Sequence, residues 1–387
     1  MSLQSFLHWI MQFVLPLFGW RVPVRLLRGT APGSGRPVAL LNAGGTSDFI
    51  LSHFFASPPQ VVRSTRVPIW RLQRLVDAWR TEADLTLVKV DRLSARLFLD
   101  GHGIVVPEWI GSWIQLPADW REFVRTHASA STDLRRVRIK KYTREISRSV
   151  QDFDEFYHRC YRPFTLARHG AGAGITPRWR LRLLFRQGVL LWVCRNGVRV
   201  AGSLSIVKGR RFFMLCSGLM DGRMELLKEG ALSSDYVLSF QAAAELGCTE
   251  VHMGGSMPSL HDGIFRYKSK WATGLSVHDG FVSGNMVMEI GWSRLEGAVA
   301  EFLSRTSLIC HDGDGFSALW AFPADQPLTA ATLKEHYARL HSRSLRRFCI
   351  LLPGEPPPDF ACPPEVRLAP MASVAHDTPT QLLSRMP

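Results

Sequence analysis

The sequence lacks the spacings that most metal, redox and covalent-catalysis sites need. No two cysteines form a C-x-x-C pair, which excludes the common zinc-site and disulfide-framework patterns. We therefore expect no metal, and reduced, mostly buried thiols in a cytoplasmic protein. A Walker-type G-K-[ST] loop is absent, and no Ser-His-Asp or Cys-His spacing stands out. The seven cysteines stand singly, at Cys160, Cys194, Cys216, Cys248, Cys310, Cys349 and Cys362.

Long apolar runs are also scarce. The one candidate, residues 3–20, is short for a transmembrane helix, which needs about 20 apolar residues, and Pro16 interrupts it. It has no basic n-region and no small-residue cleavage site, which argues against a signal peptide. Because Arg21, Arg25 and Arg28 follow, two interpretations stay open: a helix in a membrane interface, or a buried N-terminal helix. We expect a cytoplasmic location, with peripheral contact at the inner membrane face as an alternative.

Acidic residues are in deficit. The chain has 47 Lys and Arg against 33 Asp and Glu, a net charge of +14, which indicates an anionic partner such as phosphate groups, nucleic acid or a membrane surface. Residues 133–149 hold seven basic side chains and two acidic ones. A solvated helix face is the usual meaning of such a run, but this excess should also attract phosphate. There is no zinc finger, basic zipper or RNP-type strand to favour duplex binding.

Three β-prone segments precede a helix and a further strand. Residues 189–195, 198–207 and 211–217 read as strands, and Asn196-Gly197 is a strong hairpin turn between the first two. Residues 249–253 form another short β-prone run. The order predicts three antiparallel strands, a helix, and then a fifth element that is again a strand.

The stretch of residues 228–271 connects these elements. Ser233, Ser234 or Asp235 could cap the helix, and Gly247 stands where a helix-ending glycine belongs. Gly254-Gly255 ends the following strand sharply, and a second helix is predicted to begin near Asp262.

These residues carry a family resemblance. The stretch resembles the C-terminal half of GNAT-superfamily acyltransferases, in particular the Fem-type aminoacyltransferases and the CelD-like acetyltransferases of polysaccharide biosynthesis. The matching residues are Gly254-Gly255, Asp262-Gly263, Phe265, Tyr267-Lys268 and Lys270-Trp271. The resemblance implies an α/β (α+β) GNAT-like fold, with two GNAT-like halves and a mixed, largely antiparallel central sheet.

The expected domain organisation follows from that fold. We expect an apolar N-terminal helix at 1–29, a degenerate first half at 30–150, and a second half with the active-site motif at 151–284. An α/β appendage at 285–352 and a partly disordered Pro-rich tail at 353–387 complete the chain. Within the appendage, residues 286–303 are predicted to form one helix.

The resemblance also assigns roles to residues. Asp262 and His252 are candidates for the general base, and Lys268 for neutralising a phosphate or the developing oxyanion. The donor would bind at the helix N-terminus, at Lys228, Glu229, Gly230, Ala231, Ser233 and Ser234. Candidates for substrate binding are Gly254, Gly255, Tyr267, Arg135, Arg136 and Arg138.

Each candidate has an ordinary structural alternative. His252 alternates with its neighbours on a strand, Lys268 could be a surface lysine, and the GNAT pyrophosphate loop Q/R-x-x-G-x-G/A is echoed only at Glu229, Gly230 and Ala231. We expect an acyltransferase that uses acyl-coenzyme A as co-substrate and an anionic cell-envelope or polysaccharide precursor as acceptor. Two alternatives stay open: a tRNA-dependent aminoacyltransferase, in which nucleic acid is a partner, and an inactive GNAT-like module that binds an anionic partner.

Overall fold

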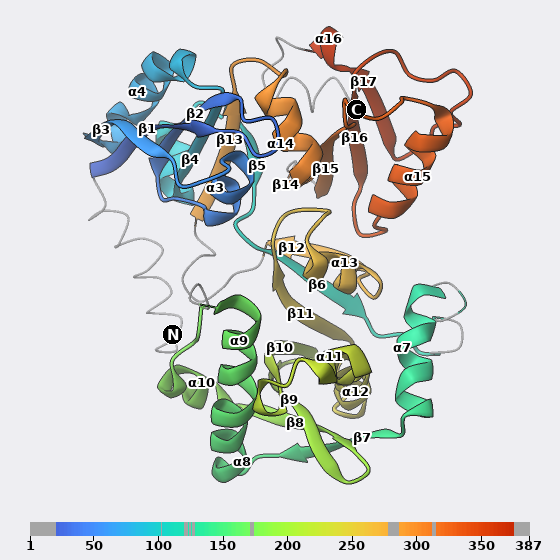
Figure 1. Cartoon of the computed structure of the whole chain (residues 1–387). Helices are drawn as coiled ribbons and strands as arrows, with labels where there is room; N and C mark the ends of the chain where they lie inside the picture. The colour runs from blue at the N-terminus through green and yellow to red at the C-terminus, as the bar shows by residue number, and fades with distance from the viewer. Residues whose placement is uncertain are drawn as a thin grey trace. The chain divides into compact units, whose positions relative to one another are not determined.

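The computed structural model describes residues 21–101, 103–119, 123, 125, 128–170, 174–277, 286–311 and 315–374. The chain forms two compact units (Figure 1). Unit 1 takes residues up to Ile110, Gly255–Arg266 and residues from Leu275 on, and unit 2 takes Gly111–Gly254 and Tyr267–Gly274. The predicted N-terminal helix at residues 3–20 lies outside the described residues.

Unit 1 is built on a ten-stranded mixed sheet of order β17-β16-β15-β14-β5-β13-β4-β2-β1-β3. Its first elements are β1 (Arg21–Thr30), β2 (Pro37–Gly44), α3 (Asp48–Phe54), β3 (Gln60–Pro68), η2 (Ile69–Arg71), α4 (Leu72–Trp79), η3 (Arg80–Glu82), β4 (Leu85–Asp91), α5 (Arg92–Phe98) and β5 (Ile104–Val106). Its later elements are β13 (Met286–Trp292), α14 (Ala298–Thr306), β14 (Leu308–His311), β15 (Phe316–Ala321), α15 (Ala330–Leu340), β16 (Arg347–Leu352), β17 (Val366–Pro370) and α16 (Met371–Val374).

The C-terminal segments belong to this sheet and do not form an appendage. Strand β13 pairs antiparallel with both β4 and β5, which places a late segment in the middle of early ones. The single helix predicted for residues 286–303 is wrong: Met288, Ile290 and Trp292 are buried alternately, as in a strand, and the helix α14 begins only at Ala298. Part of the expected Pro-rich tail is ordered as β17 and α16.

Unit 2 begins at Gly111, so the expected boundary at residue 150 falls inside it. Its elements are β6 (Ile110–Gln115), α7 (Ala128–Ile139), β7 (Tyr142–Ser147), α8 (Val150–Glu155), the π-helical η4 (Phe156–Tyr161), α9 (Arg162–His169), α10 (Arg178–Phe185), β8 (Gly188–Arg195), β9 (Val198–Lys208), β10 (Arg211–Leu219), η6 (Met220–Gly222), α11 (Glu225–Glu229), α12 (Ala231–Glu245) and β11 (Glu250–Ser256). The helix α13 (Gly263–Ser269) and the strand β12 (Gly274–Val277) cross the unit boundary.

The sheet of unit 2 has the order β12-β6-β11-β10-β9-β8-β7. Strands β7 to β10 pair antiparallel, β10 pairs parallel with β11, and α12 lies between these last two in sequence. The predicted order of three antiparallel strands, a helix and a further strand is therefore confirmed. Asn196 and Gly197 both have positive φ (51° and 77°), as a two-residue hairpin turn requires.

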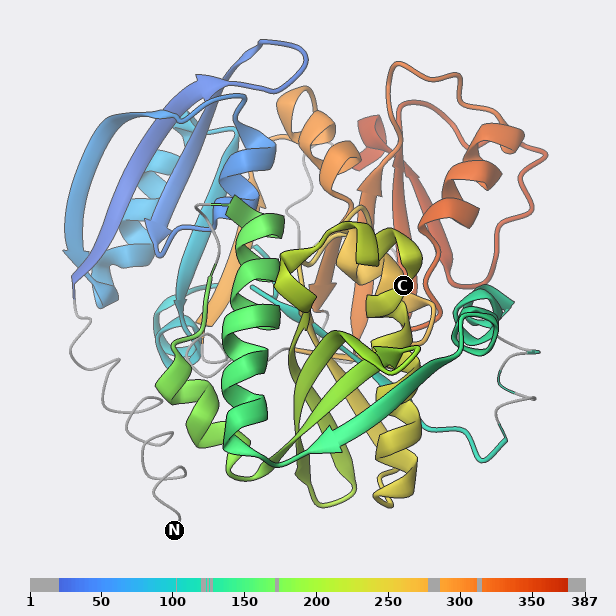
Figure 2. The same ribbon diagram turned by 60° about the horizontal axis from the view of Figure 1, so that its bottom comes forward.

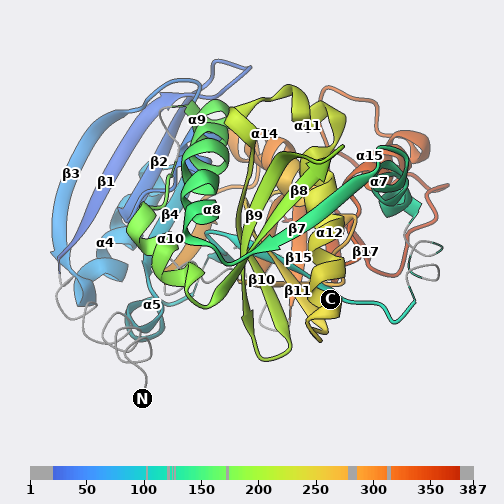
Figure 3. The same ribbon diagram turned by 90° about the horizontal axis from the view of Figure 1, so that it is seen from below.

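Helices cover both faces of this sheet (Figure 3). The continuous segment α8-η4-α9, drawn in green, runs alongside the strands in Figure 2, and Phe156 packs edge-on against Trp192 of β8. Val189 of the same strand belongs to the core that contains Phe240 of α12. Because successive strand residues point to opposite faces, β8 contributes to both cores.

The basic run at residues 133–149 is not one helix. α7 ends at Ile139, Lys141 takes a left-handed conformation (φ 52°), and Arg144 lies in β7, which pairs with β8. Pairing with β8 therefore overrides the local helical pattern. Among the described residues, no helix is long and apolar enough to cross a membrane.

Candidate functional site

Strands β10 and β11 separate part-way along their length. They are paired at only three positions, of which Phe213 with His252 is the last, although both strands continue for several residues. The parallel pair therefore opens into a V within unit 2, at the carboxyl side of the pairing. A gap between parallel strands exposes backbone N–H and C=O groups that a ligand can use.

A β-bulge in β10 lies directly after this point. Met214 is opposite Ser205 of β9 and Cys216 is opposite Leu204, so Leu215 is the extra residue. A bulge breaks the ladder locally and re-aims the strand, and bulges are common next to active sites. Here the bulge coincides with the place where β10 leaves β11.

His252 lies on the sheet face opposite Val251 and Met253. Its ring stacks on Phe213 with centroids 4.5 Å apart and contacts Trp113, and a ring nitrogen is 3.4 Å from a Glu250 carboxylate oxygen. Burial lowers the pKa of His252 below its usual 6.5, against the opposing effect of Glu250. The imidazole is therefore neutral at physiological pH and able to accept a proton.

Lys268 of α13 is buried beside the opening of the V. Its ammonium nitrogen donates a hydrogen bond of 2.9 Å to the carbonyl oxygen of Gly254, and only 3% of the residue is exposed. Gly254 has positive φ (75°), and a Cβ there would lie 3.3 Å from the carbonyl oxygen of Met214. Lys268 is therefore not the surface lysine of the structural alternative. Its amino group is buried at the point where the two strands part, and it is hydrogen-bonded there as a buried polar group must be.

A second cluster lies at the N-terminus of α12. The helix begins at Ala231, and its N-cap Gly230 is left-handed (φ 90°), so neither serine nor Asp235 caps it as predicted. Instead the hydroxyls of Ser233 and Ser234 both donate back to the Gly230 carbonyl, at 3.0 and 2.9 Å. Because these two hydroxyls donate to a carbonyl, they do not cap the backbone N–H groups of the first turn of α12, which can bind other partners.

Arg136 of α7 covers this glycine. A Cβ on Gly230 would lie 2.1 Å from Cδ of Arg136, and the guanidinium donates to Ser233 Oγ (3.2 Å) and to Asp133 (2.9 Å). The Asp133 carboxylate offsets the charge of Arg136, which would otherwise oppose the positive end of the α12 dipole. Because any side chain at position 230 would collide with Arg136, only glycine allows the arginine to lie across this turn.

The turn before α12 is held by further basic and polar groups. Lys140 Nζ (3.0 Å) and the Tyr142 hydroxyl (3.3 Å) both donate to the carbonyl oxygen of Glu229, and Arg195 forms an ion pair with the Glu229 carboxylate. Burial and the nearby Glu229 charge raise the pKa of Tyr142, although Arg195 opposes them. The basic run and the predicted donor-binding segment, separate in sequence, therefore meet in unit 2.

Other predicted residues lie apart from these contacts. Arg135 and Arg138 are exposed on α7, Lys228 is exposed on α11, and Ala231 is buried. Only Arg136, of the three arginines predicted to bind substrate, reaches α12.

Tyr267 lies in unit 2 with its phenol oxygen buried near Asp133 and Trp271. Burial, followed by the Asp133 charge, raises the pKa of this phenol well above 10. Its ring packs edge-on against Tyr236. Tyr267 therefore helps to anchor α13 against α7 and α12.

Asp262 and Gly255 belong to unit 1. The Asp262 carboxylate accepts a hydrogen bond of 2.7 Å from the backbone N–H of Phe265, so the predicted helix start near Asp262 is confirmed and its side chain caps α13.

One buried acid was not among the predicted site residues. Asp235 of α12 is fully buried, and its carboxylate accepts hydrogen bonds from Ser203 of β9 (2.5 Å) and Ser217 of β10 (2.8 Å). Burial raises its pKa to about 6, and the serine hydrogen bonds act in the opposite direction. Ser203 and Ser205, polar residues within the apolar middle of β9, were the available signal.

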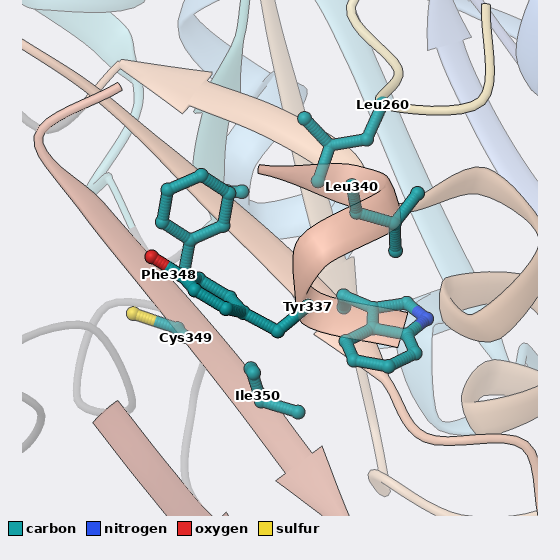
Figure 4. Close-up of a pocket in the computed structure, with 8 residues that line it drawn as sticks. Leu260, Tyr337, Leu340, Phe348, Cys349 and Ile350 are labelled. Carbon is teal, nitrogen blue, oxygen red and sulfur yellow. The ribbon is translucent and has the colours of Figure 1, made fainter. Parts of the chain in front are cut away.

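One cavity of unit 1 offers no comparable site. That cavity has a volume of about 10 Å³, room for no more than a water, and apolar and aromatic side chains from α15, β16 and the Leu260 segment surround it (Figure 4). Across the described parts of the chain, no group of three or more His, Cys, Asp and Glu side chains is placed to hold a metal ion.

Comparisons with known proteins find only distant structural likeness. No family model matches the sequence, and no curated protein matches it. The crystal structure of FemX is 12% identical with a TM-score of 0.38, covering 68% of this chain and 83% of that one. The structure of L-PGS from Bacillus licheniformis is 13% identical with a TM-score of 0.35, again covering 68% and 83%.

A GCN5-related N-acetyltransferase from Kribbella flavida is 12% identical with a TM-score of 0.25, covering 65% of this chain and 80% of that one. All of these scores are low. The function proposed below therefore rests on the geometry of unit 2.

Proposed function

We propose that the chain is an acyltransferase that moves an acyl group from acyl-coenzyme A to an amine or hydroxyl of a cell-envelope or polysaccharide precursor. The observation that carries this proposal is the V between β10 and β11, which opens after the Phe213–His252 pair with a bulge in one arm and the Lys268 ammonium at the other. A thioester placed in the V would lie where β10 and β11 no longer pair, beside the buried Lys268 side chain. Acyl transfer needs both a polarised carbonyl and a stabilised oxyanion.

The N-terminus of α12 is the proposed anion site for the donor. Its backbone N–H groups and helix dipole favour phosphate, and Arg136 and Lys140 add positive charge over the Glu229–Gly230 turn. Lys228, Ala231, Ser233 and Ser234 complete the segment that we expect to contact the pyrophosphate. Gly230 supports this role because its missing side chain lets Arg136 lie across the turn.

The proposed chemistry is a direct transfer. The acceptor amine or hydroxyl attacks the thioester carbonyl, a base takes the proton, the C–S bond breaks, and the thiolate leaves and is protonated. We assign the role of base to His252, which is neutral because burial lowers its pKa. Lys268 would donate a hydrogen bond to the developing oxyanion. Asp262 is the second candidate base.

Gly254, Gly255 and Tyr267 are proposed to shape the acceptor side, and the exposed Arg135 and Arg138 to attract its charge. The acceptor would be an anionic precursor met at the cytoplasmic side of the membrane. Aminoacyl-tRNA is the alternative donor, because only Glu229, Gly230 and Ala231 resemble the usual coenzyme A loop.

The first test is thermal unfolding of the full chain with coenzyme A, acetyl-coenzyme A, longer acyl-coenzymes A and bulk tRNA in parallel. A ligand at 100 times its Kd stabilises the folded state by about 2.7 kcal/mol. We expect a coenzyme A thioester to raise the unfolding temperature. Arg136→Gln should abolish this increase, whereas Arg135→Gln, on the exposed side of α7, should leave it nearly intact. A shift with tRNA alone would move the donor to aminoacyl-tRNA.

The Asp262 role has its own matched test. Asp262→Ser keeps an oxygen that can cap α13 but removes the carboxylate, whereas Asp262→Ala removes both, at about 1 kcal/mol of stability. If Asp262 is the base, both variants lose transfer activity. If it only caps the helix, Asp262→Ser retains activity.

A catalytically inactive module that binds an anionic partner is the rival from a different class. Arg135, Arg138 and the overall charge of +14 favour it. Such a module would bind its anion with a steep salt dependence and would lose affinity in Arg135→Gln/Arg138→Gln, while Lys268→Met would leave it unchanged. The enzyme is distinguished by Lys268→Met, which lowers its transfer activity.

A further inference from the structure

Helix α10, labelled in Figure 3, exposes large apolar side chains next to arginines. Trp179 is 70% exposed and Leu183 is 51% exposed. With the exposed Arg186 they stand at positions i, i+4 and i+7, which form one stripe along the helix. Leu181 and Phe185 on the other side are buried, so the helix is anchored in the core and the stripe faces outward.

A surface cavity adjoins this stripe within unit 2. It has a volume of about 440 Å³. Arg182 of α10, Arg186 directly after the helix and Arg148 from the loop before α8 all line it. Val150 and Leu246, 44% and 43% exposed, add apolar surface to its lining. The cavity therefore combines three guanidinium groups with an apolar wall.

Several other arginines of unit 2 are paired with carboxylates. Arg144, Arg159, Arg178, Arg195 and Arg199 of unit 2 each form an ion pair with a carboxylate. Within the residues that the structure describes, Arg148, Arg182 and Arg186 form no ion pair.

Arg182 instead stacks on the rings of Phe153 and Phe185. Three guanidinium groups that share one cavity without a carboxylate repel one another. An external anion at that place would relieve this repulsion.

We infer that α10 and this cavity form a docking surface for a bilayer that contains anionic phospholipids. The arginines would hold lipid headgroup phosphates at the cavity, while Trp179 and Leu183 enter the interface region beside them. Exposed apolar side chains rimmed by cations suit a membrane surface, where tryptophan is favoured at the level of the headgroups.

Single-stranded nucleic acid fits this surface less well. Binding of that kind relies on successive bases stacked on several aromatic rings in a basic groove. Here Trp179 is the one ring in the stripe, and the apolar lining is aliphatic at Val150 and Leu246. The inference goes beyond the proposed acyl transfer and does not depend on it, because vesicle binding is measured without any acyl donor or acceptor.

The test is co-sedimentation of the full chain with vesicles of pure phosphatidylcholine and of phosphatidylcholine with 30% phosphatidylglycerol, a composition chosen to resemble roughly the surface charge of an anionic leaflet. Each arginine near such a surface strengthens binding roughly fivefold, so Arg148→Gln/Arg182→Gln/Arg186→Gln should weaken binding to anionic vesicles by on the order of a hundredfold. Trp179→Ser should weaken binding to both compositions about tenfold.

Two further variants keep the test decisive. Arg182 packs on two aromatic rings, so Arg148→Gln/Arg186→Gln is measured as well, with thermal unfolding as a check of folding. Replacement of all three arginines by lysine should restore most of the charge-dependent binding.

The matched control lies in unit 1, where Trp70 is 53% exposed and Arg66, Arg71 and Arg74 are exposed around η2 and α4. Its variant, Trp70→Ser with the three arginines changed to glutamine, should bind as wild type does. The inference is overturned if the glutamine variants bind anionic vesicles like wild type, or if the control variant loses as much binding. It is also overturned if the arginine-dependent binding is to bulk tRNA and vesicles do not bind.

Discussion

The buried carboxyl of Asp235 should make the stability of the protein depend on pH in an unusual direction. Asp235 is fully buried between α12, β9 and β10, with two serine hydroxyls as its hydrogen-bond donors. Most carboxyl groups stabilise the folded state when they are ionised, whereas burial here favours the neutral form. Asp235→Asn, a change of nearly equal volume, removes this titration.

The magnitude follows from the two pKa values. Burial raises the pKa of Asp235 from 3.8 to about 6, and each pKa unit corresponds to about 1.4 kcal/mol. The folded state binds the proton more tightly than the unfolded state, so the stabilisation is complete below pH 3.8 and is lost as pH rises through about 6. The wild type should therefore lose on the order of 3 kcal/mol over this interval relative to Asp235→Asn.

The assay is urea unfolding of both proteins at half-unit steps from pH 4 to pH 8. The difference in free energy of unfolding between the variant and the wild type should grow with pH and level off above pH 7. Ser217→Ala is the matched control: it removes one donor that lowers the pKa, so its pH dependence should be steeper than that of the wild type. A difference that stays constant across the range would refute the assignment of a raised pKa to Asp235.

Three other outcomes test the site. Gly230→Ala combines a positive φ with a clash against Arg136 and should cost about 1–3 kcal/mol in unfolding free energy, more than Gly209→Ala, which has a positive φ and open space; equal effects would contradict the close approach. Lys268→Met should lower the rate of acyl transfer, measured as thiol release, by about 100-fold or more with thermal stability checked in parallel. Transfer activity should rise with increasing pH and reach its plateau before pH 6.5, because burial lowers the pKa of His252. His252→Gln should remove this rise at acidic pH; an unchanged pH profile would exclude His252 as the base.

Local signals predicted the centre of unit 2 well. The Asn196-Gly197 turn, the strands β8 to β10 and the glycine after α12 all follow from propensities that act over a few residues. Gly247 has the positive φ (75°) that a helix-ending glycine supplies. The start of α13 was equally local, since Asp262 caps it through the N–H three residues on.

Elsewhere, pairing between strands distant in sequence decided the secondary structure against the local pattern. Residues 286–303 have helical content, but the segment Met286–Trp292 is a strand because β4 and β5 offer it partners on both sides. Tyr142–Ser147 is a strand for the same reason, although a basic run of this kind usually means a solvated helix face, because it pairs with β8. Strand pairing across such sequence distances depends on which edges are free, and a local window does not contain that information.

The sequence by itself determined the hairpin at Asn196-Gly197, the strands beside it, the motif around Lys268 and the excess of basic residues. Only the tertiary structure decided that Arg136 reaches Gly230 at the N-terminus of α12, that β10 and β11 part after Phe213, and that Asp235 is buried beneath them. The physical reason is that propensities and caps act over a few residues along the chain. Burial, strand separation and charge placement are set by groups tens or hundreds of residues apart that packing alone brings together.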